Sequence, residues 1–159
     1  MTLPLTDQQR QELVDFAKIQ AQKVMSKIPI LGAVAWLMMQ QSSTRHTLLS
    51  ELEWRVMPAL VVDQAKLYLR ADAPLAYVSW ARLSNEAADR FKNPPHHLAS
   101  GDWKSGDNNW IVDLCTPFGG ASDIITELRK TVFQGQVLSL FSIGSDGKLG
   151  AITWPASSP

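Results

Sequence analysis

The stretch AKLYLRADAPLAYVSWARL, residues 65–83, decides the fold class of this chain, because its hydrophobic period is that of strands. Leucines alternate with Lys66 and Tyr68 in its first part, and β-forming and aromatic side chains recur from Leu75 to Leu83. Such alternation is typical of half-buried strands, and the intervening ADAP has the composition of a turn. The stretch therefore predicts two neighbouring antiparallel strands, Ala65–Arg70 and Leu75–Leu83.

The residues at the start of the chain follow a helical period instead. Thr6 and Gln9 predict a capping box, and a helix with one apolar face is expected from about Asp7 to Ser26. An exposed stripe of that length is unusual for a soluble monomer, so we expect it to dock either on the rest of the protein or, in a homodimer, on a second copy. The face consists of Leu13, Val14, Ala17, Ala21 and Val24.

Proline and glycine mark the expected breaks in the helical first third. Pro29 and Gly32 are expected to interrupt the pattern before a shorter helix from Ala33 to about Gln40. Another helix is expected from Leu48 to about Met57, where Pro58 would end it.

The second half of the chain alternates between helix and strand. Ser84 and Ser122 are expected to cap helices that end near Asn93 and Val132. The chain is expected to be one domain, residues 1–159, with a helical extension at 1–28 and a disordered tail at 155–159. Strands are expected at Trp110–Leu114, Val137–Ile143 and Leu149–Trp154, the last two forming a hairpin.

Composition and charge exclude several broad classes of protein. With 45% hydrophobic residues the chain is too apolar to be disordered, and 15 basic residues balance 15 acidic ones, so no overall field favours nucleic acid. The single cysteine, Cys115, cannot form an internal disulfide and is expected to be a small buried residue. We find no secretory signal and no apolar run long enough for a membrane span, so we expect a cytoplasmic protein.

His46 and Asp113 are the titratable residues in the most informative positions. His46 follows the apolar run PILGAVAWLMM, residues 29–39, so it is either a solvated histidine at a helix end or a base at the edge of a core. Asp113 interrupts an apolar strand, and alternation places it on the face shared with Ile111, opposite Val112. A buried carboxylate needs a partner, although an acid at a strand end that caps the next loop is the simpler interpretation.

Other candidates give weaker signals. His96 and His97 have no acid or third histidine at ligand spacing, so we predict no metal site. Phe118-Gly119-Gly120 precedes a helix, an arrangement that presents backbone N–H groups to a phosphate but that is common without function.

Six short motifs follow one another between about Leu31 and Gly120. They are Leu31-Gly32 with Ala35-Trp36-Leu37, Ser42-Ser43-x-x-His46, Pro58-Ala59, Ala76-Tyr77-x-Ser79-Trp80-Ala81-x-Leu83-Ser84, Asp102-Trp103-x-Ser105-Gly106-Asp107, and Trp110-x-x-Asp113-x-x-x-Pro117-Phe118-Gly119. Each is weak alone, but in this order and spacing they resemble the RTX-toxin-activating lysine acyltransferases.

The resemblance implies a fold, a reaction and a site. The fold is α+β and related to Gcn5-like N-acetyltransferases, with a mixed, mainly antiparallel twisted sheet flanked by helices and here an N-terminal helical extension. The reaction moves a fatty acyl group from acyl carrier protein to the ε-amine of an internal lysine in an RTX-type protoxin. Acyl-phosphopantetheine is then the co-substrate, and no cofactor is permanently bound. The implied catalytic residues are His46, Asp113 and Ser43.

The surroundings of the histidine depart from the family pattern. Where the family usually shows Pro-x-His-Arg-x-Trp, this chain has Thr44-Arg45-His46-Thr47-Leu48-Leu49, so the arginine precedes the histidine. Two alternatives therefore stay open. One is a noncatalytic module of the same fold that binds acyl carrier protein or a toxin, and the other is an acyltransferase that acts on a small amine.

The implied chemistry needs a base. A lysine amine with a pKa of about 10.4 is almost wholly protonated at pH 7, and freeing its lone pair costs roughly 4 to 5 kcal/mol. His46 has a suitable pKa to take that proton, and Asp113 would fix its tautomer and stabilise the imidazolium. Direct attack by lysine and an acylated His46 are both consistent with the sequence, and the related fold favours the direct route.

Binding is expected at three places. The acyl chain is expected against Trp36 and Met39. The phosphopantetheine arm is expected near Phe118, Gly119 and Gly120. Acidic acyl carrier protein is expected to dock on the basic residues Lys104, Arg129 and Lys130.

Overall fold

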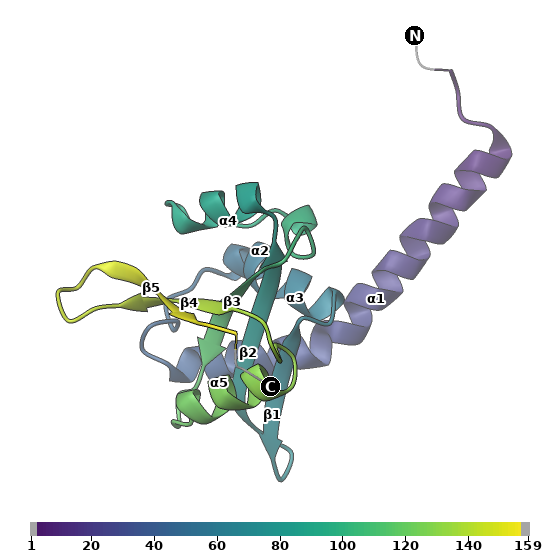
Figure 1. The fold of residues 1–159 in the computed structure, drawn as a ribbon. Helices are drawn as coiled ribbons and strands as arrows, with labels where there is room; N and C mark the ends of the chain where they lie inside the picture. Colours follow the sequence, from purple (N-terminus) through teal and green to yellow (C-terminus); the bar gives the residue numbers. More distant parts are fainter. Residues whose placement is uncertain (1–2, 157–159) are drawn as a thin grey trace.

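A five-stranded sheet in the order β1-β2-β3-β4-β5 organises the structure, a computed structural model that describes residues 3–156 (Figure 1). Neighbouring strands are antiparallel except β3 and β4, which run parallel. The fold is thus the expected α+β class, with a mixed and mainly antiparallel sheet flanked by helices, consistent with a Gcn5-like fold. The strands are β1 (Ala65–Arg70), β2 (Ala73–Leu83), β3 (Asn108–Cys115), β4 (Leu138–Ile143) and β5 (Leu149–Trp154).

The β1–β2 hairpin confirms the two strands predicted from residues 65–83. Ala65 pairs with Ser79 and Arg70 with Ala73 in antiparallel register. Ala71 and Asp72 form the turn, and both have positive φ angles, 49° and 66°. Turns of this backbone type match the right-handed twist of paired strands, which is why they join hairpins so often.

Helices cover both faces of the sheet. Tyr77 of β2 packs in a core cluster with Val34 and Leu37 of α1 (Asp7–Gln40). The next residue along β2, Val78, packs on the other face against Ile124 and other residues of α5 (Ala121–Lys130). The strict alternation along β2 therefore builds two cores, one on each side of the sheet.

α1 is a single helix of 34 residues, so the expected break at Pro29 and Gly32 is wrong. Proline removes one intrahelical hydrogen bond and costs about 3 kcal/mol in a helix interior. Burial of Val34, Leu37 and Met38 in the next turns offsets that cost, because it fixes the helix on the sheet directly after Pro29. The predicted capping box is confirmed, with the Gln9 N–H donating to Thr6 Oγ1 and the Thr6 N–H to Gln9 Oε1.

The first part of α1 projects away from the rest of the molecule (Figure 1). Every residue from Asp7 to Ser26, here called the α1 arm, is exposed. Docking of its apolar face on the rest of the same chain is therefore not observed. Contact with the body of the protein begins at Lys27, which donates to Asp63 Oδ1 at 2.8 Å.

The segment after α1 is broken into short helices. The predicted helix over Leu48–Met57 is divided into η1 (Leu49–Glu51), α2 (Leu52–Arg55) and α3 (Met57–Val61). Pro58 lies in the first turn of α3 instead of ending a helix. Proline is tolerated there because the N–H that it lacks would have no partner in any case.

The two capping predictions differ in outcome. Ser84 caps α4 (Asn85–Lys92) by accepting from the Ala87 N–H, as expected. Ser122 does not cap α5, since Gly120 is the N-cap and has a φ of +92°. The chain turns into α5 through this left-handed conformation, which favours glycine and moves the helix start two residues earlier.

The motif Asp102-Trp103-x-Ser105-Gly106 fastens a loop to β2. Asp102, at the end of η2 (Ser100–Asp102), accepts from Arg90 at 2.9 and 3.1 Å and from the Ala99 N–H. Ser105 Oγ accepts from the Ser84 N–H at 2.8 Å. At Gly106 an added Cβ would lie 2.6 Å from the Leu83 carbonyl oxygen, so the loop approaches β2 too closely for any side chain.

No helix within residues 3–156 is long and apolar enough to cross a membrane. The predicted tail at 155–159 falls largely on residues 157–159, which lie outside the described residues, while Pro155 and Ala156 have no regular secondary structure.

Candidate functional site

Asp113 is buried near the carboxyl end of β3, with 6% of its surface exposed. It does not share a face with Ile111, contrary to the alternation in the sequence. Ser79 pairs with Asp113 while Trp80 pairs with Ile111, so β3 carries one extra residue, Val112, at a bulge. A bulge reverses the alternation beyond it, and Asp113 therefore faces the side of α1–α3 while Ile111 faces α5.

Arg55, at the end of α2, is the partner of Asp113. Its Nε donates to Oδ1 at 2.8 Å and to Oδ2 at 2.9 Å, and its Nη2 donates to Oδ1 at 2.5 Å. Burial raises the pKa of Asp113, and the hydrogen bonds and positive charge of Arg55 act against that rise. The pair thereby allows a charged carboxylate to persist in a low-dielectric site.

Cys115 lies two residues beyond Asp113 and is a buried free thiol, as predicted. Burial raises the pKa of Cys115 to about 11, and the charge of Asp113 adds to the rise. The thiol is therefore protonated at neutral pH and is no nucleophile in this state.

The turn that carries His46 is anchored to the end of β3. Gln41, the C-cap of α1, accepts from the Thr116 N–H through Oε1 at 2.9 Å. Thr44 is buried, and its Oγ1 donates to the Met38 carbonyl oxygen at 2.8 Å. This bond gives a partner to a carbonyl group in the last turn of α1. The polar residues after the apolar run thus fix this turn beside the strand end where Asp113 lies.

His46 itself is exposed at the surface of this turn. No hydrogen bond joins it to Asp113 among the residues that the structure describes, and the pairing of the two stays a prediction. Asp113 Oδ2 accepts one of the three bonds from Arg55, so it keeps capacity for a further donor. Ser43 is also exposed, and its Oγ accepts from Gln41 Nε2 at 3.0 Å.

The residues expected to bind the acyl chain and its carrier arm lie on neighbouring elements. The rings of Trp36 on α1 and Phe118 beyond β3 are 6.2 Å apart between centroids. Trp36, Met39 and Phe118 are 41%, 57% and 57% exposed, respectively. This is large apolar surface in water, close to the His46 turn, and such surface is typical of a binding site.

Gly119 and Gly120 line a cleft of about 330 Å³ between α5 and the β1–β2 hairpin. Its floor is mainly apolar and includes Leu75, Ala76 and Ile124. Tyr68 and Glu127 also line it, and the Tyr68 hydroxyl donates to Glu127, which accepts a second bond from Lys66 at 2.6 Å. The bonds from Lys66 and Tyr68 lower the pKa of Glu127. Burial raises the pKa of Tyr68, and its hydrogen bond to Glu127 raises it further.

The three basic residues predicted to dock a carrier protein are divided between two places. Arg129 and Lys130 lie in the last turn of α5, and Arg129 Nη2 donates to the Pro155 carbonyl at 3.1 Å. Lys104 lies beside Arg82 of β2, to which an isolated β-bridge joins it. In the described chain no hydrogen bond links Lys104 to the α5 pair, so a common docking surface stays a prediction.

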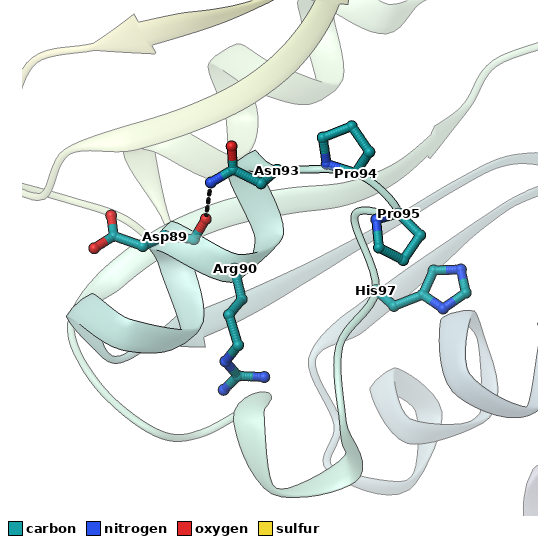
Figure 2. A pocket seen from close by; sticks show the side chains of 6 residues that line it. All are labelled: Asp89, Arg90, Asn93, Pro94, Pro95 and His97. Atoms are coloured by element: carbon teal, nitrogen blue, oxygen red, sulfur yellow. Dashed lines mark hydrogen bonds between the residues drawn. The ribbon is translucent and has the colours of Figure 1, made fainter.

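His97, but not His96, lines another hollow, of about 420 Å³, beside α4 (Figure 2). Figure 2 shows that the side chains of Asp89, Arg90 and His97 point in different directions, so they do not converge on one ligand position. Within residues 3–156 no group of three His, Cys, Asp or Glu side chains is placed to hold a metal ion.

Sequence reasoning missed Arg55 and Gln41. Arg55 is a cation within the otherwise apolar WRVMPAL, residues 54–60, and that position was a signal for a buried partner. Gln41 gave no comparable signal, because its bond to Thr116 joins residues 75 positions apart.

Comparison with known proteins gives one consistent result. A sequence model of the RTX toxin acyltransferase family matches residues 23–153. The protein-lysine myristoyltransferase RtxC of Kingella kingae is 36% identical over 135 residues, which cover 85% of this chain and 74% of that protein. The RTX-I toxin-activating lysine-acyltransferase ApxIC of Actinobacillus pleuropneumoniae is 30% identical over 131 residues, 82% of this chain and 76% of its own length. The protein-lysine myristoyltransferase HlyC of Escherichia coli is 37% identical over 103 residues, 65% of this chain and 61% of its own length.

Proposed function

The chain belongs to the RTX toxin acyltransferase family, and from this premise we propose that it transfers a fatty acyl group from acyl carrier protein to the ε-amine of an internal lysine of an RTX-type protoxin. The family match over residues 23–153 carries the proposal. The names of the relatives, which are lysine acyltransferases and toxin activators, support the reaction and the acceptor.

His46 is the proposed base. In the direct route it takes a proton from the lysine ammonium, the free amine attacks the thioester carbonyl, and the carbon–sulfur bond breaks as the carbon–nitrogen bond forms. The proton on His46 then neutralises the departing thiolate, the new amide nitrogen releases its extra proton to solvent, and the imidazole is regenerated. The exposure of His46 on an anchored turn supports this role, because a large protein substrate has to reach the base.

Asp113 is the proposed partner of His46, and Arg55 holds it in place. A carboxylate that accepts a hydrogen bond from a ring N–H stabilises the imidazolium formed during the reaction. Free capacity on Oδ2 supports contact with His46, either directly or through one water molecule. Ser43, three residues before His46, is proposed to contribute a hydroxyl at the same edge.

The acyl chain is proposed to run over Trp36, Met39 and Phe118 toward the cleft beside Gly119 and Gly120. The exposed apolar surface of the first three and the apolar floor of the cleft support this path. The backbone N–H groups at the start of α5, which has no side-chain cap, suit the phosphopantetheine phosphate.

Intact-mass spectrometry tests the proposal directly. The protein is incubated with candidate protoxins and with acyl carrier protein loaded with chains of different length. We expect a mass increase of one acyl group on the protoxin, lost in His46→Ala and kept in Thr47→Ala, a control in the same turn. No transfer to any protoxin with any loaded carrier, while the carrier still binds, would favour the noncatalytic module. Transfer to small amines alone would assign the acceptor differently.

A further inference from the structure

The cleft beside Gly119 and Gly120 runs along one side of α5. Gly120, Ile124 and Glu127 line it and follow one another at steps of four and three residues, which places them on one face of the helix. The helix rises about 10 Å from Gly120 to Glu127. The two glycines therefore mark one end of the cleft, and Glu127 marks the other.

The floor between the two ends is apolar. It consists of Leu75 with Ala76 and Ile124, and the last two are only 2% and 7% exposed. None of these side chains carries a hydrogen-bond donor or acceptor. Asp123, the other acid of the lining, lies at the glycine end, in the first turn of α5. A hydrocarbon chain is therefore the kind of ligand that suits this floor.

A polar cluster lies at the Glu127 end of the cleft. Glu127 accepts from Lys66 Nζ at 2.6 Å through Oε1 and from the Tyr68 hydroxyl through Oε2. Tyr68 pairs with Ala76 across the β1–β2 hairpin, so its ring lies beside the apolar floor while its hydroxyl reaches the acid. Both bonds lower the pKa of Glu127, which is therefore ionised at neutral pH.

The charges of this cluster are still in contact with water. The side chains of Lys66 and Glu127 are 37% and 39% exposed. A methylene group laid on the apolar floor improves binding about fourfold. A methylene group laid over the ion pair would displace its water, and removing two charges from water costs more than that gain. Binding therefore improves with chain length only as far as the cluster.

We propose that Glu127, paired with Lys66, sets the longest acyl chain that the protein accepts, with the methyl end of the chain stopping at the ring of Tyr68. The inference rests on the proposed transfer of an acyl group, and it makes Glu127 a specificity-determining residue of that reaction. The apolar floor, the position of the ion pair at its end and the exposure of both charges each support this role.

Carrier proteins loaded with saturated chains that differ by two carbons test the limit. For the wild type we expect kcat/KM to rise by up to about 15-fold per two-carbon step as far as the limiting length, and then to fall. Lys66→Met combined with Glu127→Met removes both charges and leaves the net charge of the chain at zero. In this variant we expect the first chain beyond the limit to gain roughly 10-fold or more, and shorter chains to change by less than about twofold.

Two further double variants separate the ion pair from general effects of substitution. Lys27→Met with Asp63→Asn removes an ion pair of 2.8 Å outside the cleft, also at constant net charge, and is expected to keep the wild-type limit. Lys66→Gln with Glu127→Gln keeps polar side chains without charge, and is expected to move the limit in the same direction by a smaller factor. It also serves if the methionine pair does not fold, as judged by circular dichroism.

Binding measured without transfer distinguishes this inference from the proposed function. Dissociation constants for the same loaded carriers are measured by calorimetry in the His46→Ala background, with and without the substitutions at Lys66 and Glu127. A limit in binding that moves with these substitutions supports the inference even if no protoxin is acylated. Acyl transfer with the same limit in all variants would overturn the inference and leave the proposed function in place. Binding that does not depend on chain length would overturn it as well.

Discussion

Arg55 donates hydrogen bonds to both carboxylate oxygens of Asp113, and this contact joins α2 to β3 across 58 residues of sequence. Asp113 is 6% exposed while the Arg55 side chain is 24% exposed, so the acid depends more on its partner than the base does. Removal of Arg55 leaves a buried carboxylate without its partner, whereas removal of Asp113 leaves a partly exposed guanidinium that water can reach. The two losses of stability are therefore expected to differ.

Replacement of Arg55 by methionine is expected to lower the free energy of unfolding by about 3 to 5 kcal/mol, because a buried carboxylate loses its partner. The double variant Arg55→Met with Asp113→Asn is expected to recover part of that loss, since the remaining amide is neutral. Urea denaturation of the two single variants and the double variant gives the coupling free energy. Arg45→Met, on the exposed His46 turn, is the control. Purely additive losses would show that the pair is not coupled.

Arg55→Lys is expected to move the acid limb of the pH–rate profile to higher pH. Lysine keeps the positive charge but not the forked hydrogen bonds of Arg55. The pKa of Asp113, which burial raises, is then opposed less strongly and rises further. The ionised form needed beside His46 is consequently lost at a higher pH as the solution is acidified. A pH–rate profile identical to that of the wild type would show that catalysis does not depend on the ionisation of Asp113.

Two glycine-to-alanine substitutions are expected to have opposite signs. Gly106→Ala places a Cβ 2.6 Å from the Leu83 carbonyl oxygen, and we expect it to destabilise the protein by roughly 1 to 3 kcal/mol or more. Gly32→Ala lies within α1, where the new Cβ meets nothing within 4 Å, and is expected to stabilise by up to about 1 kcal/mol. Thermal unfolding of the two variants gives both signs at once. Equal effects would contradict the close approach at Gly106.

Asp102 is expected to make stability depend on acid pH. The hydrogen bonds from Arg90 lower its pKa in the folded state. Its contribution is therefore fully present above the ordinary aspartate pKa of about 3.9 and is lost as the pH falls below that value. Asp102→Asn should cost about 1 to 3 kcal/mol at pH 7 and little at pH 2.5, by urea denaturation at both pH values. Asp89→Asn, an exposed neighbour, should change stability little at either pH.

Reversal of charge at Lys130 is expected to weaken the use of acyl carrier protein. An acidic carrier meets a negative side chain in Lys130→Glu, so the apparent KM for the carrier rises and its salt dependence flattens, while kcat stays nearly constant. Lys148→Glu, on the β4–β5 hairpin, is the matched control. Lys104→Glu tests whether the separate basic position belongs to the same surface. Unchanged kinetics in both Lys130→Glu and Lys104→Glu, or equal use of acyl-CoA, would contradict carrier docking at these residues.

Local patterns predicted the elements whose structure depends on their own residues. Alternation gave β1 with the bounds that the structure has, and Ser84 and Thr6 acted as the caps that their positions indicated. Trp36 and Phe118 both lie in family motifs and their rings are 6.2 Å apart, while their role in binding stays a prediction. The structure of β1 and of the two helix caps depends on residues that are close together in the sequence.

Predictions failed where distant residues decide the outcome. The helix continues through Pro29 because the following turns are buried on the sheet, and no local pattern reports that burial. The face of Asp113 depends on a bulge that exists only in the pairing of β3 with β2. The partner of Asp113 comes from α2, and a sequence gives no register between a helix and a strand.

The unbroken length of α1 carries its first residues away from the site. From Asp7 to Ser26 the helix rises about 29 Å, and every one of these residues is exposed. A protease that cuts within this segment would therefore remove none of the contacts that hold Asp113, because Arg55 and β3 lie in the body of the protein. Limited proteolysis would then shorten α1 and leave the Arg55–Asp113 pair in place.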